Sequence, residues 1–130
     1  MNKPYAKIVT IVSSLTFILF GLALLIKPEV ISSTNLTFVD EIGKIEVRAF
    51  YGGLEIGLGL LILFFDFIQK QTKSALSVVI ASFGGIGLAR AFAITQASEI
   101  NNFVLYALIF ELTLALLALA CYLAIKTDSI

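Results

Sequence analysis

The stretch EVRAFYGGLEIGLG, residues 46–59, places ionisable side chains inside a segment that is otherwise apolar. On an α-helix, one face about 60° wide would carry a basic residue, an acidic residue and two glycines. These are Arg48, Gly52, Glu55 and Gly59, with Tyr51 at their flank. Because glycines let a second backbone come close, the stretch predicts a membrane helix that packs tightly around buried charges.

The composition of the whole chain has the same character. Of its 130 residues 59% are hydrophobic and 14% charged, and the mean hydropathy is +1.02. Soluble domains are about 45–50% apolar and about 25% charged, so this excess predicts a membrane protein. The net charge is zero, which gives no reason to expect a nucleic-acid partner. The absence of histidine and the single cysteine exclude an imidazole-ligated metal and a Cys-x-x-Cys redox pair, and we expect no cofactor and no metal.

Four apolar stretches approach or exceed the roughly 20 residues that cross about 30 Å of hydrocarbon. We expect spans at about 5–27, 46–68, 74–97 and 102–125, with an outer loop over 28–45. Short links force consecutive helices to run antiparallel. The prediction is an all-α integral membrane protein, an antiparallel four-helix transmembrane bundle, with residues 1–130 as a single domain. A soluble bundle would need polar outer faces, which the first span lacks.

The orientation of the spans follows from their flanking basic residues. Lysines that we expect on the cytoplasmic side lie in the N-terminal tail, in the link between the second and third spans, and in the C-terminal tail. They are Lys3, Lys7, Lys70, Lys73 and Lys126. Since short cytoplasmic segments are enriched in Lys and Arg, both termini are predicted to be cytoplasmic. Asp66 and Lys70, four residues apart, are interpreted as an ordinary interfacial ion pair on one helix face.

Three charges fall inside the expected spans: Glu55, Arg90 and Glu111. A charge at the bilayer centre costs about 2.5–3.5 kcal/mol, so such side chains usually face the interior and pair. At about 1.5 Å per residue, all three lie within about 8 Å of the midplane and on its outer side. We therefore predict one buried network, with Arg48 and Tyr51 at its mouth. A purely structural ion-pair network and charges that snorkel to the surface remain alternatives.

Small residues mark the faces where helices are expected to touch. In the third span a small residue recurs every four positions from Ala81 to Ala97. We predict close helix packing at these glycines: Gly52, Gly53, Gly57, Gly59 and Gly85.

The motif E-x-R-A-x-Y-G-G-L-E-x-G-L-G in residues 46–59 resembles that of a family of small bacterial four-helix membrane proteins, domain of unknown function 4345. The resemblance covers nearly the whole chain, including Pro28 after the first span and the pair Glu111-Leu112. Ala89-Arg90 departs mildly from the family's Gly-Arg. The family is also distantly similar to DoxX-type membrane proteins. The resemblance implies a bacterial cytoplasmic (inner) membrane and no particular activity. It points to these site residues: Glu46, Arg48, Tyr51, Glu55, Arg90 and Glu111.

These features favour a protein that binds a small amphipathic ligand or a membrane lipid at a charged site in the outer half of the bundle. A proton-coupled small-molecule transporter and an accessory subunit of a larger membrane complex are the alternatives. The expected partners are thus lipid, the ligand, and a second copy or another membrane protein. An enzyme is disfavoured and no catalytic residue is assigned, because no nucleophile–base pair is visible and histidine, the commonest general base, is absent.

Overall fold

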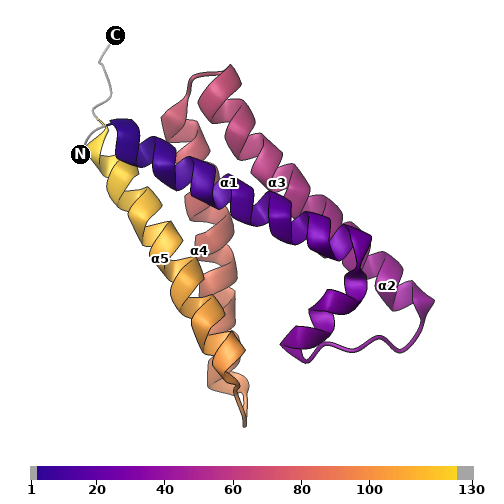
Figure 1. Ribbon diagram of the computed structural model, residues 1–130. Coiled ribbons are helices and arrows are strands. Elements are labelled where there is room, and N and C mark those ends of the chain that lie inside the picture. Colours follow the sequence, from indigo (N-terminus) through magenta and orange to yellow (C-terminus); the bar gives the residue numbers. More distant parts are fainter. Residues whose placement is uncertain (1–2, 126–130) are drawn as a thin grey trace.

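The computed structural model describes residues 3–125, and within this range every regular element is helical (Figure 1). Four helical segments are long and apolar enough to cross a membrane: Pro4–Ile26, Glu41–Ile68, Thr72–Gln96 and Asn102–Ala124. This agrees with the expected all-α class. Lys126, on which the predicted orientation partly rests, lies outside the described residues.

The first, third and fourth of these segments are the single helices α1 (Lys3–Ile26), α4 (Thr72–Gln96) and α5 (Asn102–Ala124). The second is composite. It runs through α2 (Glu41–Val47), the π-helical turns η2 (Arg48–Gly53), α3 (Leu54–Leu63) and the π-helical turns η3 (Phe64–Ile68). A π turn takes one residue more than an α turn, so it rotates the side chains that follow it, and π turns are frequent at functional sites.

The connection after α1 is more ordered than the loop expected over 28–45. It begins with the 3₁₀ helix η1 (Pro28–Thr34), with Pro28 in the first turn, where its missing N–H costs nothing. The helix α2 then starts at Glu41 rather than at 46. The Lys44 Nζ lies 3.3 Å from a Glu29 carboxylate oxygen and 2.7 Å from one of Glu41, which ties α2 to η1. The backbone N–H of Glu29, and next Lys44, hold the pKa of the Glu29 carboxyl below its usual value.

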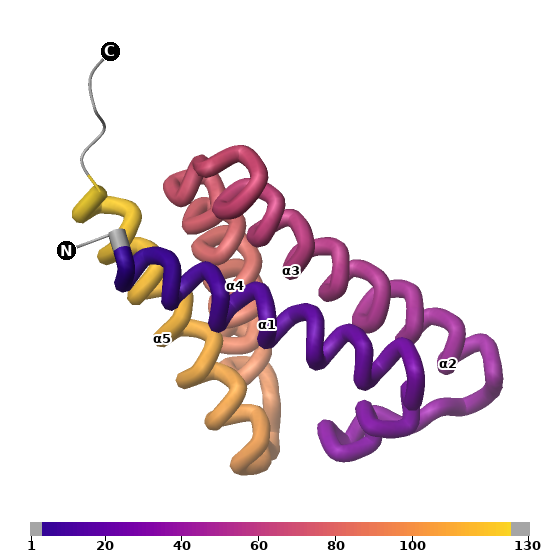
Figure 2. Tube along the Cα trace, turned by 45° about the horizontal axis from the view of Figure 1, so that its top comes forward, coloured from indigo at the N-terminus to yellow at the C-terminus, as the bar shows by residue number. Residues whose placement is uncertain are grey.

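The long helices form two pairs, α1 with α3 and α4 with α5 (Figure 1). The pairs meet near the two termini and diverge toward the other end of the molecule, as Figure 2 also shows. We call the end that contains η3 and the start of α4 the closed end. The end that contains η1, η2 and the start of α5 is the open end.

Glycines bring the helices of each pair close together. A Cβ added to Gly59 would lie 2.8 Å from the backbone oxygen of Ser14 in α1, and one on Gly52 would lie 3.1 Å from the Leu25 Cα. In the second pair, a Cβ on Gly87 would lie 2.8 Å from the Leu112 side chain. These contacts include two of the five glycines predicted to pack, Gly52 and Gly59.

The other three predicted glycines face away from neighbouring helices. A Cβ on Gly53 would meet only the carbonyl oxygen of Arg48 in its own helical run, at 3.8 Å, and one on Gly57 or Gly85 would meet nothing within 4 Å. The prediction that these three pack closely is therefore wrong within the chain. The small residues spaced by four in α4 follow a ribbon that drifts about 40° per step, and the contact falls on Gly87 instead.

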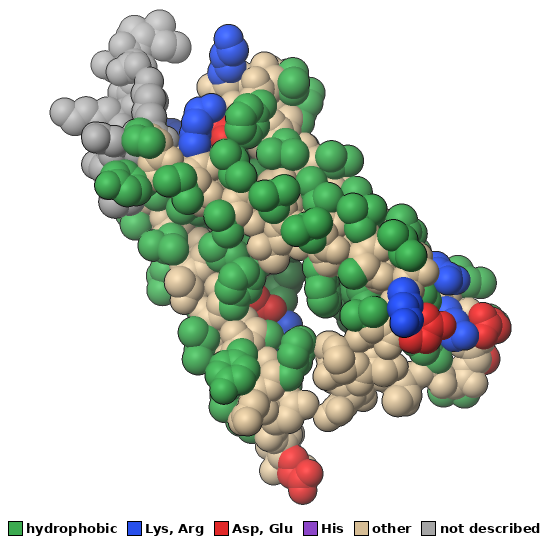
Figure 3. All heavy atoms as spheres, in the orientation of Figure 1, with side chains coloured by type: hydrophobic (Ala, Val, Ile, Leu, Met, Phe, Trp, Pro, Cys, Tyr) green, Lys and Arg blue, Asp and Glu red, His purple; other side chains and the backbone are tan. Residues whose placement is uncertain are grey.

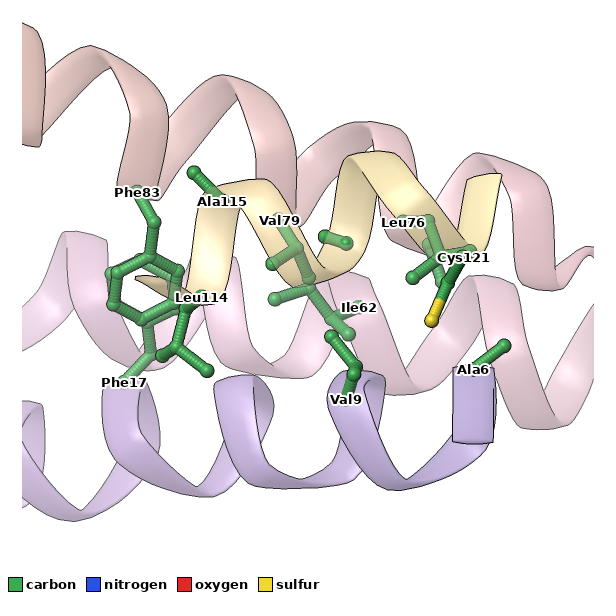
Figure 4. Close-up of a cluster of buried hydrophobic side chains, with 12 residues drawn as sticks. Ala6, Val9, Phe17, Ile62, Leu76, Val79, Phe83, Leu114, Ala115 and Cys121 are labelled. Atoms are coloured by element: carbon green, nitrogen blue, oxygen red, sulfur yellow. The ribbon is translucent and has the colours of Figure 1, made fainter. Parts of the chain in front are cut away.

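The hydrophobic core lies at the closed end and takes side chains from all four long segments (Figure 4). Val9 of α1, Ile62 of α3 and Val79 of α4 meet there beside Ala118 of α5. Toward the open end the core finishes at Phe17 and its neighbour Phe83, whose ring centroids are 4.4 Å apart. Beyond these rings the two helix pairs diverge (Figure 2).

Candidate functional site

The space between the diverging helix pairs is a cleft of about 920 Å³, lined by every long helical segment and by η1. Figure 3 shows it as a hollow with an acidic and a basic side chain on its wall. Aromatic side chains supply much of the remaining wall: Phe17, Phe20, Phe83, Phe103, Tyr106 and Phe110. The cleft is therefore largely apolar, with a few polar groups that differ sharply from their surroundings.

The strongest polar contact in the cleft joins α4 to α5. Arg90 donates from Nε to Glu111 Oε2 over 2.8 Å and from Nη2 to Glu111 Oε1 over 2.7 Å. The Arg90 side chain is 28% exposed and that of Glu111 is 10% exposed. Gly87 lies one turn before Arg90, and a Cβ there would be 3.5 Å from the Glu111 Cβ. The small residue lets the backbones approach closely enough for a two-point, charge-assisted contact.

Arg90 keeps hydrogen-bonding capacity after this contact. Its Nη1 amino group has no acceptor among the residues that the structure describes, and the side chain borders the cleft. A guanidinium has donors on all three nitrogens, so the ion pair leaves donors available to a molecule in the cleft.

Glu55 does not join this pair. It stands on α3, in the other helix pair, and it makes no ion pair or hydrogen bond within residues 3–125. Its Oε2 atom is buried and without a partner. The single network predicted for Glu55, Arg90 and Glu111 is thus split by the cleft. Tyr51 and Glu55, together with Phe17 and Ile86, border both the cleft and a side groove of about 420 Å³, so these four residues form the partition between the two hollows.

Two further residues that the sequence singled out lie at the edges of this site. The Arg48 Nε donates to the carbonyl oxygen of Leu25 over 3.2 Å, so this side chain satisfies the C-terminal end of α1 instead of lining the cleft. Glu46 is exposed and borders the side groove, beyond the partition. The sequence placed Arg48 at the mouth of the network; the structure gives it the role of a helix cap.

The sequence does not predict a second polar cluster, which lies at the closed end around Asp66. Asp66 is only 1% exposed and accepts hydrogen bonds from the hydroxyls of Thr10 and Thr72, each over 2.7 Å. The interpretation of Asp66 and Lys70 as an interfacial ion pair is wrong. The π turns of η3 and the left-handed backbone at Lys70, φ 54°, take Asp66 out of α-helical register with that lysine and turn it inward.

One signal in the sequence could have found this cluster. Three hydroxyl side chains share one face of α1, and all three are fully buried: Thr10, Ser13 and Ser14. Ser14 donates to the Gly59 carbonyl oxygen over 2.9 Å, and Thr10 reaches Asp66. A polar face on an otherwise apolar helix predicts polar partners on the neighbouring helix, and Asp66 is the carboxylate at the matching end of that segment.

Comparison with known proteins gives one family. The model for the domain of unknown function DUF4345 matches residues 5–122, which include the motif in residues 46–59, the Arg90–Glu111 pair and Asp66. No curated protein and no solved structure gives a significant match. Since the match extends over most of the sequence and contains every charged residue of the cleft, the chain belongs to the DUF4345 family.

Proposed function

We propose that the protein is a multi-pass protein of the bacterial inner membrane, an antiparallel four-helix bundle that binds a small amphipathic ligand or a lipid in its cleft. The surface supports membrane insertion, because large apolar side chains are exposed on all four long segments, as on Ile26, Phe64, Phe92 and Leu123. Figure 3 shows hydrophobic side chains, in green, over most of the visible face. An apolar surface of this extent is solvated by lipid and promotes aggregation in water.

The distribution of lysines supports an orientation. Three lysines belong to the closed end: Lys7 lies in the first turns of α1, Lys70 in the link between η3 and α4, and Lys73 in the first turn of α4. Under the positive-inside rule the closed end then faces the cytoplasm and the cleft opens in the outer half of the membrane. A ligand would enter from the outer leaflet or from the outer aqueous side.

The observation that carries the binding proposal is the cleft itself. Ligand sites are commonly concave, about 300–1,000 Å³ in volume, mostly apolar, and equipped with a few convergent polar groups. This cleft has that size, aromatic walls, and Arg90, Glu55 and Tyr51 as its polar groups. An amphipathic molecule would set its polar end against these side chains and its apolar part against the phenylalanines.

Native mass spectrometry from a mild detergent tests this proposal. We expect wild-type protein to retain a bound molecule, and Ala107→Phe, which fills the cleft wall on α5, to lose it. Ala120→Phe is the matched control, because Ala120 lies on the same helix, is exposed and is outside the cleft. Retention of the same molecule by all three proteins would place it on the outer surface and contradict the proposal.

A proton-coupled transporter of small molecules is the second candidate, and the isolation of Glu55 favours it. Such transporters use carboxyl groups inside the membrane as sites for protons and substrate, and a carboxyl that has no ion-pair partner suits that role. Transport driven by a pH gradient in reconstituted vesicles, abolished in Glu55→Gln, would support this reading over simple binding. The accessory-subunit alternative stays a prediction that co-purification of a stoichiometric partner would test.

A further inference from the structure

We propose that the cleft selects an amphiphile with a cationic head group, for which Glu55 is the counter-ion. This inference rests on the proposed binding function and adds the chemical class of the ligand. It follows from the charges on the cleft wall, the unpartnered carboxyl of Glu55 and the aromatic surface beside it.

The charges that border the cleft are unbalanced. One basic side chain, Arg90, faces three acidic ones, Glu55, Glu99 and Glu111. Arg90 is already engaged at two nitrogens by Glu111. The wall therefore has a net negative charge once this pair is counted as neutral. The side groove adds to the imbalance, because it is bordered by Glu46 and Glu55 and by no basic residue.

Glu55 lacks the partner that a carboxylate at this depth requires. Its Oε2 atom is buried without a hydrogen bond. Leaving an ionised carboxylate unpaired in apolar surroundings is costly, whereas an opposite charge nearby offsets that cost. An ammonium group in the cleft supplies this opposite charge. An anionic head group could reach the Nη1 donors of Arg90, yet it would then meet the like charges of Glu111 and Glu55.

The aromatic wall favours the same class of ligand. Phe83 packs against Phe17 with a centroid distance of 4.4 Å and against Phe110 at 6.2 Å, edge to face, and all three rings border the cleft. Tyr51 stands one helical turn before Glu55 on the partition. Aromatic faces attract cations through their quadrupole, and they also accept the hydrocarbon part of an amphiphile. The wall thus combines a counter-ion with surfaces that suit both ends of a lipophilic cation.

The test compares three probes of equal chain length: decyltrimethylammonium, neutral decanol and anionic decanoate. Each is titrated by calorimetry into protein held in nanodiscs of digalactosyldiacylglycerol, an uncharged bilayer lipid, with Ala107→Phe nanodiscs as the blank for partition into lipid. We expect the cation to bind at least about tenfold more tightly than either analogue, since a close charge pair near a protein surface is strong enough for that factor. Glu55→Gln keeps the size of the side chain and should lose this preference. Glu41→Gln, an exposed glutamate outside both hollows, should keep it.

The outcomes separate the two proposals. Tighter binding of decanol or decanoate, lost in Ala107→Phe, would overturn the cationic preference and leave the binding function intact. Unchanged binding of the cation by Glu55→Gln, with the variant folded by circular dichroism, would overturn the role of Glu55. If no probe exceeds the blank, the cationic inference fails, and the absence of any retained molecule in native mass spectrometry would then remove the binding function as well.

Discussion

The closed and open ends of the molecule each contain a carboxyl group with a buried oxygen atom, Asp66 and Glu55 respectively, and of these two only Asp66 has hydrogen-bond partners within the described residues. At the closed end Asp66 is 1% exposed, and two threonine hydroxyls from α1 and α4 donate to it within a packed core. At the open end Glu55 has a buried oxygen with no partner and stands beside a cleft of about 920 Å³. A buried polar group that its own chain satisfies stabilises the fold, whereas one left unsatisfied beside a cavity is free to bind a ligand.

The Arg90–Glu111 pair lies between these two cases. It borders the cleft, as Glu55 does, yet its main contact is made within the chain, as for Asp66. Three charged sites therefore differ in how far the chain itself satisfies them. That difference predicts how much each one contributes to stability, and substitutions at Arg90, Asp66 and Glu55 measure it.

The largest loss is expected where a substitution leaves a charge uncompensated. Arg90→Leu should lower the free energy of unfolding in detergent by about 3 kcal/mol, the lower end of the range for broken buried pairs, because Arg90 is 28% exposed. The double variant Arg90→Leu with Glu111→Leu should recover part of this loss, since no lone carboxylate remains. Thermal or denaturant unfolding measures both. A double variant less stable than Arg90→Leu would mean that the pair does not act as one unit.

The second largest loss of stability is expected at Asp66, at the closed end. Asp66→Ala removes the acceptor of Thr10 and Thr72 together and should cost about 2 kcal/mol, as hydrogen bonds to charged groups do. Asp66→Asn should recover much of this, because a threonine hydroxyl can rotate and accept from the amide. Glu99→Ala, at the exposed rim of the cleft, is the control and should unfold like wild type. Equal stability of Asp66→Ala and wild type would remove the contrast between the two ends.

The sequence predicted the parts of this arrangement that depend on composition and on regular helical geometry. The four long apolar helices follow from hydropathy. The pairing of Arg90 with a carboxylate follows from depth, opposite sign and small neighbours on adjacent helices, and the structure identifies Glu111 as the partner. The split between Glu55 and that pair could not be predicted, because it depends on how far the pairs diverge beyond Phe17 and Phe83.

The predicted ion pair of Asp66 with Lys70 is wrong for a different physical reason. The i,i+4 rule assumes an α-helix, and the π turns of η3 break that register. In α4 the apolar residues are spread around the whole helix, so periodicity does not identify its packing face. The prediction names Gly85, whereas Gly87 makes the contact. In both cases tertiary packing decided which side chain turned inward.

The third prediction compares two glycines in one helix. A Cβ at Gly59 would lie 2.8 Å from the backbone oxygen of Ser14, so Gly59→Ala should force α1 and α3 apart and cost about 1–2 kcal/mol, in the range for overpacking. Gly57→Ala meets nothing within 4 Å and gains helix propensity, so it should be neutral or slightly stabilising. Paired melting curves in the same detergent decide this. The reverse order of stability would mean that α1 and α3 do not meet at Gly59.

The smallest effect on stability is expected at Glu55, and it is the most decisive for the comparison. Glu55→Gln removes no ion pair and no hydrogen bond within the described chain, so the free energy of unfolding should change by less than about 0.5 kcal/mol. The sign should favour the variant if it changes at all, because a neutral amide is easier to bury than an unpaired carboxylate. The melting curves must be recorded after bound molecules are removed by extensive detergent exchange, since a ligand held by Glu55 would stabilise wild type alone. If Glu55→Gln costs as much as Arg90→Leu in this ligand-free state, then Glu55 belongs to the Arg90–Glu111 network. The cleft would then have to close around all three charges, and the contrast between the satisfied carboxyl of Asp66 and the unsatisfied carboxyl of Glu55 would be lost.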